Sequence, residues 1–186
     1  SRNGHLQCVE LLLDRHANIN AAEHYDTTPL HLASAKGHHQ CVELLLDRHA
    51  NINAVMTFCR STPLHLASRN GHLQCVELLL DRHANINAVE YYDNNTPLHL
   101  ASANGHLQCV ELLLDRHANI NTFGNHGTPL HFAAEKGHLQ CVELLLDRHA
   151  NINAVVEYYQ DTPLHSASRN GHLQCIEILI DHGASK

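Results

Sequence analysis

The chain has 186 residues, a length typical of one domain, and only 4% of them are aromatic, so its core must be aliphatic. The formal net charge of −7 argues against a partner with a phosphate backbone, such as a nucleic acid. No run of 18 apolar residues is present, so we expect no membrane span.

The chain is built from repeats. Residues 4–20 read Gly-His-Leu-Gln-Cys-Val-Glu-Leu-Leu-Leu-Asp-Arg-His-Ala-Asn-Ile-Asn, and this segment returns three times unchanged and once with a single difference, His39. The tetrapeptide Thr-Pro-Leu-His recurs at intervals of 34, 34, 32 and 34 residues. A fixed period of this length predicts a stack of similar supersecondary units. The tetrapeptides begin at Thr28, Thr62, Thr96, Thr128 and Thr162.

Each unit predicts two short helices joined by a turn and followed by a loop. In the second complete unit, Thr62 is a helix N-cap and Pro63 takes the first helical position, where a missing N–H costs nothing. This helix should end at Asn70 and Gly71, a turn pair. A second helix over about 73–81 places its apolar and polar residues on opposite faces. Neither helix is long enough to be stable alone, so each must bury its apolar face against neighbouring units.

The chain resembles the ankyrin-repeat family, whose Thr-Pro-Leu-His-x-Ala signature and period of about 33 residues are distinctive. The resemblance implies an all-α solenoid of stacked helix-turn-helix units, with β-hairpin-like fingers that project from one side at a right angle. We expect one array over residues 1–186. Its expected parts are a partial first repeat with its finger (1–27), four internal repeats (28–61, 62–95, 96–127 and 128–161) and a C-terminal repeat (162–186).

Two features depart from the family pattern. The family usually has glycine after the second helix, where the backbone turns left-handed, but only Gly183 follows this rule here. The fingers also vary in length, with 7, 8, 8, 6 and 8 residues. Neither end has the polar outer face of a terminal repeat, which predicts a piece of a longer array. The histidines that replace glycine, and that we expect to be left-handed, are His16, His49, His83, His117 and His149.

Six of the seven cysteines occupy one position of the second helix, where we expect them to be small buried residues. Stacked helices lie about 8–10 Å apart, whereas a disulfide needs Cα atoms within about 7 Å. Cys59 lies in a finger and should be exposed. Free thiols favour a reducing compartment, such as the cytoplasm, if the protein is natural. The six are Cys8, Cys41, Cys75, Cys109, Cys141 and Cys175.

The histidines invite two chemical interpretations, and we favour a structural role over both. His-x-x-Cys recurs in five units, but a zinc site needs four donors about 2.0–2.3 Å from one ion, and repeat-related copies do not converge. In ankyrin repeats the tetrapeptide histidine ties its turn together, and nothing here supplies a nucleophile or a paired carboxylate. We expect no metal, no cofactor and no catalytic residue. The tetrapeptide histidines, which should be largely buried, are His31, His65, His99, His131 and His165.

The repeats differ mainly in their fingers, which contain the single methionine and every aromatic residue except Phe132, at a variable helix position. Exposed rings gain little for folding but supply much of the energy at protein interfaces. The alternative is that the rings pack on neighbouring fingers and stiffen them. The fingers are residues 21–27, 54–61, 88–95, 122–127 and 154–161. The expected partner-binding residues are Tyr25, Met56, Phe58, Arg60, Glu90, Tyr91, Tyr92, Asp93, Phe123, His126, Phe132, Glu157, Tyr158 and Tyr159.

The finger charges favour a partner protein with a neutral-to-basic facing surface, because six acidic residues stand against one basic residue, Arg60. We predict non-enzymatic recognition of a folded protein by a monomer, through the fingers and the concave helix face. Two origins stay open: an engineered binder, or a natural scaffold or adaptor fragment of a larger protein. A non-catalytic enzyme subunit is a weaker alternative. The acidic residues are Glu23, Asp26, Glu90, Asp93, Glu157 and Asp161.

Overall fold

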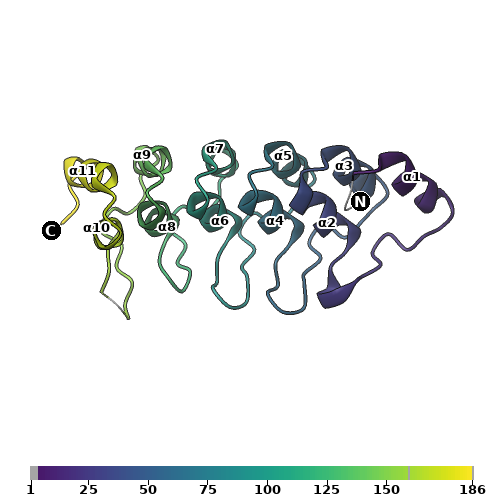
Figure 1. Cartoon of the computed structure of the whole chain (residues 1–186), viewed down its shortest axis with the longest axis horizontal. Helices are drawn as coiled ribbons and strands as arrows, with labels where there is room; N and C mark the ends of the chain where they lie inside the picture. The colour runs from purple at the N-terminus through teal and green to yellow at the C-terminus, as the bar shows by residue number, and fades with distance from the viewer. Residues whose placement is uncertain (1–3, 159, 186) are drawn as a thin grey trace.

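The computed structural model describes residues 4–158 and 160–185, which form two rows of α-helices with the fingers projecting beyond one row (Figure 1). This architecture confirms the all-α ankyrin solenoid. The first-helix row comprises α2 (Pro29–Lys36), α4 (Pro63–Arg69), α6 (Pro97–Ala103), α8 (Pro129–Lys136) and α10 (Pro163–Arg169). The second-helix row comprises α1 (Leu6–Asp14), α3 (His39–Asp47), α5 (Leu73–Asp81), α7 (Leu107–Asp115), α9 (Leu139–Asp147) and α11 (Leu173–Asp181). A short 3₁₀ turn, η1 (His24–Asp26), lies in the first finger.

Every first helix begins with the same capping arrangement, illustrated by α4. The Thr62 hydroxyl accepts a hydrogen bond from the His65 backbone N–H, and the Thr62 N–H donates to His65 Nδ1 at 3.1 Å. Because Nδ1 accepts a backbone N–H, the ring proton lies on Nε2. Nε2 donates to the Asn95 carbonyl, at the end of the following finger, at 3.1 Å. The tetrapeptide histidine therefore joins the start of the first helix to the finger at the end of the same repeat.

Four of the five tetrapeptide histidines are buried, as predicted, and one is not. Burial lowers the pKa of His31 and His131, and it lowers the pKa of His65 and of His99 to about 4. The expectation that His165 is also buried is wrong, because its side chain is exposed. The finger that covers each ring lies at the end of the same repeat, and the described part of the C-terminal repeat contains no such finger.

A second histidine in each repeat packs on the glycine of the preceding repeat. His72 Nε2 donates to the Ala35 carbonyl at 3.1 Å, and a Cβ added to Gly37 would lie 2.6 Å from His72 Nδ1. Gly37 also has φ +74°, in the left-handed region. This position therefore requires glycine for its backbone conformation and for the approach of the next histidine ring.

The core between the two rows is aliphatic, as the composition predicts, and five of the six helix cysteines are buried in it. Cys8 is exposed, so the prediction of six buried thiols is wrong at this position. The reason is local, since residues 4–20 contain no first helix to cover that face of α1. The left-handed conformation is confirmed, with φ between 61° and 66°, for His16, His49, His83, His117 and His149.

Exposed ion pairs connect consecutive second helices at their C-terminal ends. The guanidinium of Arg48 lies 3.0 Å from Asp14, and that of Arg116 lies 2.6 Å from Asp81. Such exposed pairs contribute at most about 1 kcal/mol each, so they add little to the stability of the array. No helix in the described part of the chain has the length and apolar character needed to cross a membrane.

Candidate functional site

The fingers are closed at their bases by backbone hydrogen bonds. Met56 N–H donates to the Ser61 carbonyl at 3.2 Å, and Glu90 N–H donates to the Asn95 carbonyl at 3.0 Å. In the fourth finger the bridge joins Gly124 to Gly127, and a similar bridge closes the fifth finger. These contacts give the fingers the hairpin-like form that the sequence predicts.

Backbone hydrogen bonds also join the first four fingers to one another, and the fifth finger follows them at the end of the row (Figure 1). Thr57 N–H donates to the Tyr25 carbonyl at 2.9 Å, and Tyr91 N–H donates to the Cys59 carbonyl at 2.8 Å. The third and fourth fingers are joined in the same way, by a bond of 2.8 Å from Asn125 N–H to the Asp93 carbonyl. A surface ordered in this way loses less conformational entropy when a partner binds. We call the five fingers, at the residues given above, the finger row.

Left-handed residues shape the finger tips. In the first finger, Tyr25 and Asp26 have φ of 63° and 58°, values that a bulky residue rarely adopts. Arg60, Asn94 and Gln160 are left-handed at the corresponding turns of three other fingers. Strained backbone of this kind tends to occur where loops bind ligands, which is consistent with a recognition role for the tips.

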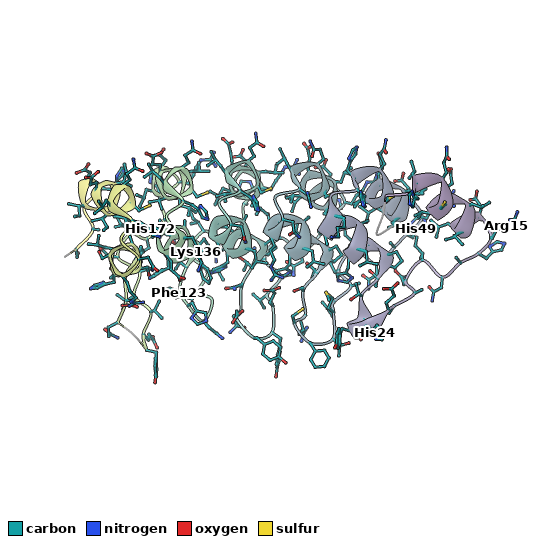
Figure 2. The ribbon with its side chains drawn as sticks, in the orientation of Figure 1. Arg15, His24, His49, Phe123, Lys136 and His172 are labelled. Carbon is teal, nitrogen blue, oxygen red and sulfur yellow. The ribbon has the colours of Figure 1, made fainter. Side chains whose placement is uncertain are left out.

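Six of the predicted rings are exposed at the finger row, with between 49% and 87% of their surface accessible. Figure 2 shows side chains that extend from this edge of the molecule, where Phe123 is labelled. The alternative that rings stiffen the fingers holds for one pair, since Tyr25 and Phe58 pack edge to face at 4.8 Å between neighbouring fingers. Both rings nevertheless remain more than half exposed. The six are Tyr25, Phe58, Tyr91, Tyr92, Phe123 and Tyr158.

Two of the predicted apolar contacts are only half-buried, Met56 and Phe132. The Phe132 ring meets the buried ring of His99 edge to face, with centroids 5.4 Å apart. Phe132 is therefore a contact of the framework as well as a surface residue. Tyr159 lies outside the residues that the structure describes.

Glu90 is not an exposed binding residue, which corrects the prediction. Its side chain is buried, accepts a hydrogen bond from the Ser61 hydroxyl and lies 2.7 Å from the Arg69 guanidinium. A carboxylate in this position holds the third finger against α4 and is closed to a partner. Asp161 in the fifth finger is likewise unavailable to a partner, because its side chain is mostly buried and pairs with Arg169.

The remaining predicted charged residues are exposed. Asp93 Oδ1 lies 3.9 Å from His126 Nε2, which is beyond hydrogen-bond distance, and both side chains are more than half accessible. Arg60 and Glu157 are also exposed. With two of the six finger acids paired internally, the exposed acidic excess of the row is smaller than the sequence count indicates.

The sequence interpretation missed one surface feature. A hollow of about 560 Å³ lies between the second and third fingers, and the predicted residues Arg60 and Tyr91 line it together with Val55, Val89 and Asn94. The two valines are 42% and 47% exposed. The sequence could have indicated these apolar residues, because three of the five fingers begin with Ala-Val.

The described His-x-x-Cys pairs do not form a metal-binding cluster. Within residues 4–158 and 160–185, no three His, Cys, Asp or Glu side chains lie close enough together to hold a metal ion. In a representative His-x-x-Cys pair, the His72 ring faces the Ala35 carbonyl while Cys75 is buried in the core. Burial raises the pKa of the Cys75 thiol to about 11, which leaves it unreactive at neutral pH.

Comparisons with known proteins agree with this geometry. No curated protein matches the chain. Among solved structures, the human ASB11 ankyrin repeat domain is 31% identical and superposes with a TM-score of 0.88, over 99% of this chain and 81% of that chain. The family described as ankyrin repeats (3 copies) matches residues 1–56, 55–124 and 121–186. The chain therefore belongs to the ankyrin-repeat family.

Proposed function

We propose that the array binds a folded protein through the finger row and the adjoining side of the first helices. Ankyrin repeats are generally protein–protein interaction modules. The observation that supports a site on the fingers is the set of six exposed rings, five of which lie on the four fingers that backbone hydrogen bonds join. Rigid loops with exposed tyrosines provide a large contact area at a low cost in entropy.

The proposal is tested by comparing what three immobilised proteins capture from a lysate, with quantitative mass spectrometry as the readout. The proteins are the unaltered array, a ring variant and a control variant. The ring variant carries Phe58→Ala, Tyr91→Ala, Tyr92→Ala and Tyr158→Ala. The control variant carries as many alanine substitutions on exposed residues of the second helices, at Gln74, Glu77, Gln108 and Glu111.

We expect the control to capture the same proteins as the unaltered array and the ring variant to lose them. Truncating one anchoring ring typically costs about 2 kcal/mol, or about thirtyfold in affinity. Both variants should melt at the temperature of the unaltered array, because the substituted side chains are exposed. A ring variant that retains the captured proteins, or a control that loses them, contradicts the proposal.

Two further features of the proposal follow from the sequence. The array acts as a monomer, and its seven free thiols support a reducing compartment if the protein is natural. Recognition through the fingers is the same whether the array is an engineered binder or a fragment of a larger adaptor. Size-exclusion chromatography with light scattering tests the monomer, and a stable dimer would contradict it.

A further inference from the structure

Alternate fingers carry an exposed tyrosine beside an exposed carboxylate. The three ring–carboxylate pairs are on the first, third and fifth fingers, and the tyrosines are 60–87% accessible. The second and fourth fingers carry phenylalanine with a basic residue instead, Phe58 with Arg60 and Phe123 with His126. The ring–carboxylate pairs are Tyr25 with Asp26, Tyr92 with Asp93, and Tyr158 with Glu157.

The carboxylates of these pairs are exposed to solvent, whereas Glu90 and Asp161 pair with arginine side chains. Asp93 is 52% accessible, and the nearest basic atom, on His126, is beyond hydrogen-bond distance. Asp26 accepts a hydrogen bond from the Thr57 hydroxyl and remains exposed. Glu157 is exposed as well. A partner therefore meets an exposed ring and a negative charge on adjacent residues of each of these three fingers.

A tyrosine next to a carboxylate selects a cationic side chain. A cation over an exposed ring gains about 0.5–1 kcal/mol, and the carboxylate adds an ion pair to the same group. Arginine fits best, because its planar guanidinium stacks on the ring and hydrogen bonds to the carboxylate at once. A carboxylate alone accepts any cation and a ring alone accepts any apolar group, so the pair is more selective than either part.

The alternation fixes a spacing. Consecutive repeats are about 8–10 Å apart, so ring–carboxylate pairs recur about every 16–20 Å. The second finger, between the pairs on the first and third fingers, presents Phe58 and Arg60, which accept an apolar side chain and repel a cation. A complementary partner therefore has an uncharged, apolar stretch between its cationic residues.

We propose that the finger row binds a basic segment of a partner protein, with arginine or lysine side chains about 16–20 Å apart and apolar side chains between them. This inference rests on the proposed function and names its partner class. In an extended segment the spacing corresponds to about five or six residues, and in a helix to about 11–13 residues.

The test is selection of binders from a random 16-residue peptide library displayed on phage, against the folded full-length array. Selected peptides are then measured against three variants, each checked for an unchanged melting temperature. The charge variant carries Asp26→Asn, Asp93→Asn and Glu157→Gln. The ring variant carries Tyr25→Ala, Tyr92→Ala and Tyr158→Ala. The matched control carries Glu43→Gln, Glu77→Gln and Glu111→Gln on exposed sites of the second helices, so its net charge changes by the same amount.

We expect the selected peptides to be enriched in arginine or lysine at the stated spacing. Their affinity should fall about tenfold or more in the charge variant and in the ring variant, and less than about threefold in the control. Peptides that need the rings but lack basic residues, or that lose affinity equally in the control, overturn the inference and leave the proposed function standing. If no selected peptide depends on any finger residue, the inference and the proposed function both fail.

Discussion

Acidification from pH 7 to pH 5 should destabilise the array through its buried tetrapeptide histidines. The Nδ1 atom of His65 accepts a backbone N–H and its Nε2–H donates to a carbonyl, so the neutral ring satisfies both contacts and a protonated ring loses the first. Burial opposes the charged form further and lowers the pKa of His65 and of His99 from 6.5 to about 4. Both rings therefore bind protons more readily in the unfolded chain.

The size of the effect follows from these two values. For a group whose folded pKa is depressed, the stabilisation is present above the unfolded value of 6.5 and is lost as the pH falls toward about 4. Between pH 7 and pH 5 each histidine loses about 2 kcal/mol, so His65 and His99 together lose about 4 kcal/mol. His31 and His131 act in the same direction, because burial also lowers their pKa. A loss of this size is a large part of the stability of a typical domain.

The measurement is the free energy of unfolding in urea at constant ionic strength, from pH 7.5 to pH 4.5. Replacing the two groups with His65→Gln and His99→Gln should lower stability at pH 7 and flatten the pH dependence. His165→Gln is the matched control, since it changes the same motif at an exposed site and should keep the pH dependence of the unaltered array. If the unaltered array loses less than about 1 kcal/mol between pH 7 and pH 5, or the control flattens the curve equally, the reasoning is refuted.

Three further predictions concern thiols, buried hydroxyls and glycines. Cys8 and Cys59 should react quickly with a thiol reagent and the five buried thiols slowly, so intact-mass analysis should show two fast adducts, and more than two would contradict the stacking. Ser68→Ala should be neutral or stabilising by up to about 1 kcal/mol in urea unfolding, because its buried hydroxyl has no partner; a loss above about 1 kcal/mol would show an essential bond. Gly71 and Gly171 have the same left-handed backbone, with φ of +72° and +71°. An alanine Cβ at position 71 would lie 2.5 Å from His106 Nδ1, whereas one at position 171 would contact nothing. Gly171→Ala should therefore cost about 1 kcal/mol and Gly71→Ala at least about 1 kcal/mol more, and equal losses in thermal unfolding would exclude the ring contact.

Most of the fold could be predicted from the sequence because its signals are local. The Thr62 cap and Pro63 define the start of α4, and Gly71 follows its end, so the helix lies where the sequence places it. The second helix α5 spans Leu73–Asp81, within the range that the apolar pattern predicts. The period then determines the stack, since no unit can bury its apolar face alone.

What could not be predicted is the burial that more distant segments of the array supply. His165 and His65 lie in the same Thr-Pro-Leu-His motif, yet one is exposed and the other buried, because the finger that covers His65 has no counterpart in the described residues after His165. Cys8 is exposed and Cys41 is buried because residues 4–20 contain no first helix to cover that face of α1. A motif specifies the helix it starts, but its solvent exposure depends on its place in the array.

The role of Glu90 required the three-dimensional structure, because its partner Arg69 is 21 residues away in the sequence. One feature of the sequence could have predicted that Glu90 is buried. Glu90 occupies the third position of its finger, where the second and fifth fingers have Met56 and Val156, which are half-buried and buried. A charge at an apolar position predicts an internal partner rather than a surface contact.

Binding through the finger row is tested most directly by amide hydrogen exchange on the array with and without a captured partner protein. We predict slower exchange for amides within residues 54–61 and 88–95 when the partner is bound, and unchanged exchange along α5 and α7. Slower exchange confined to the second helices, with the fingers unchanged, would contradict recognition through the fingers.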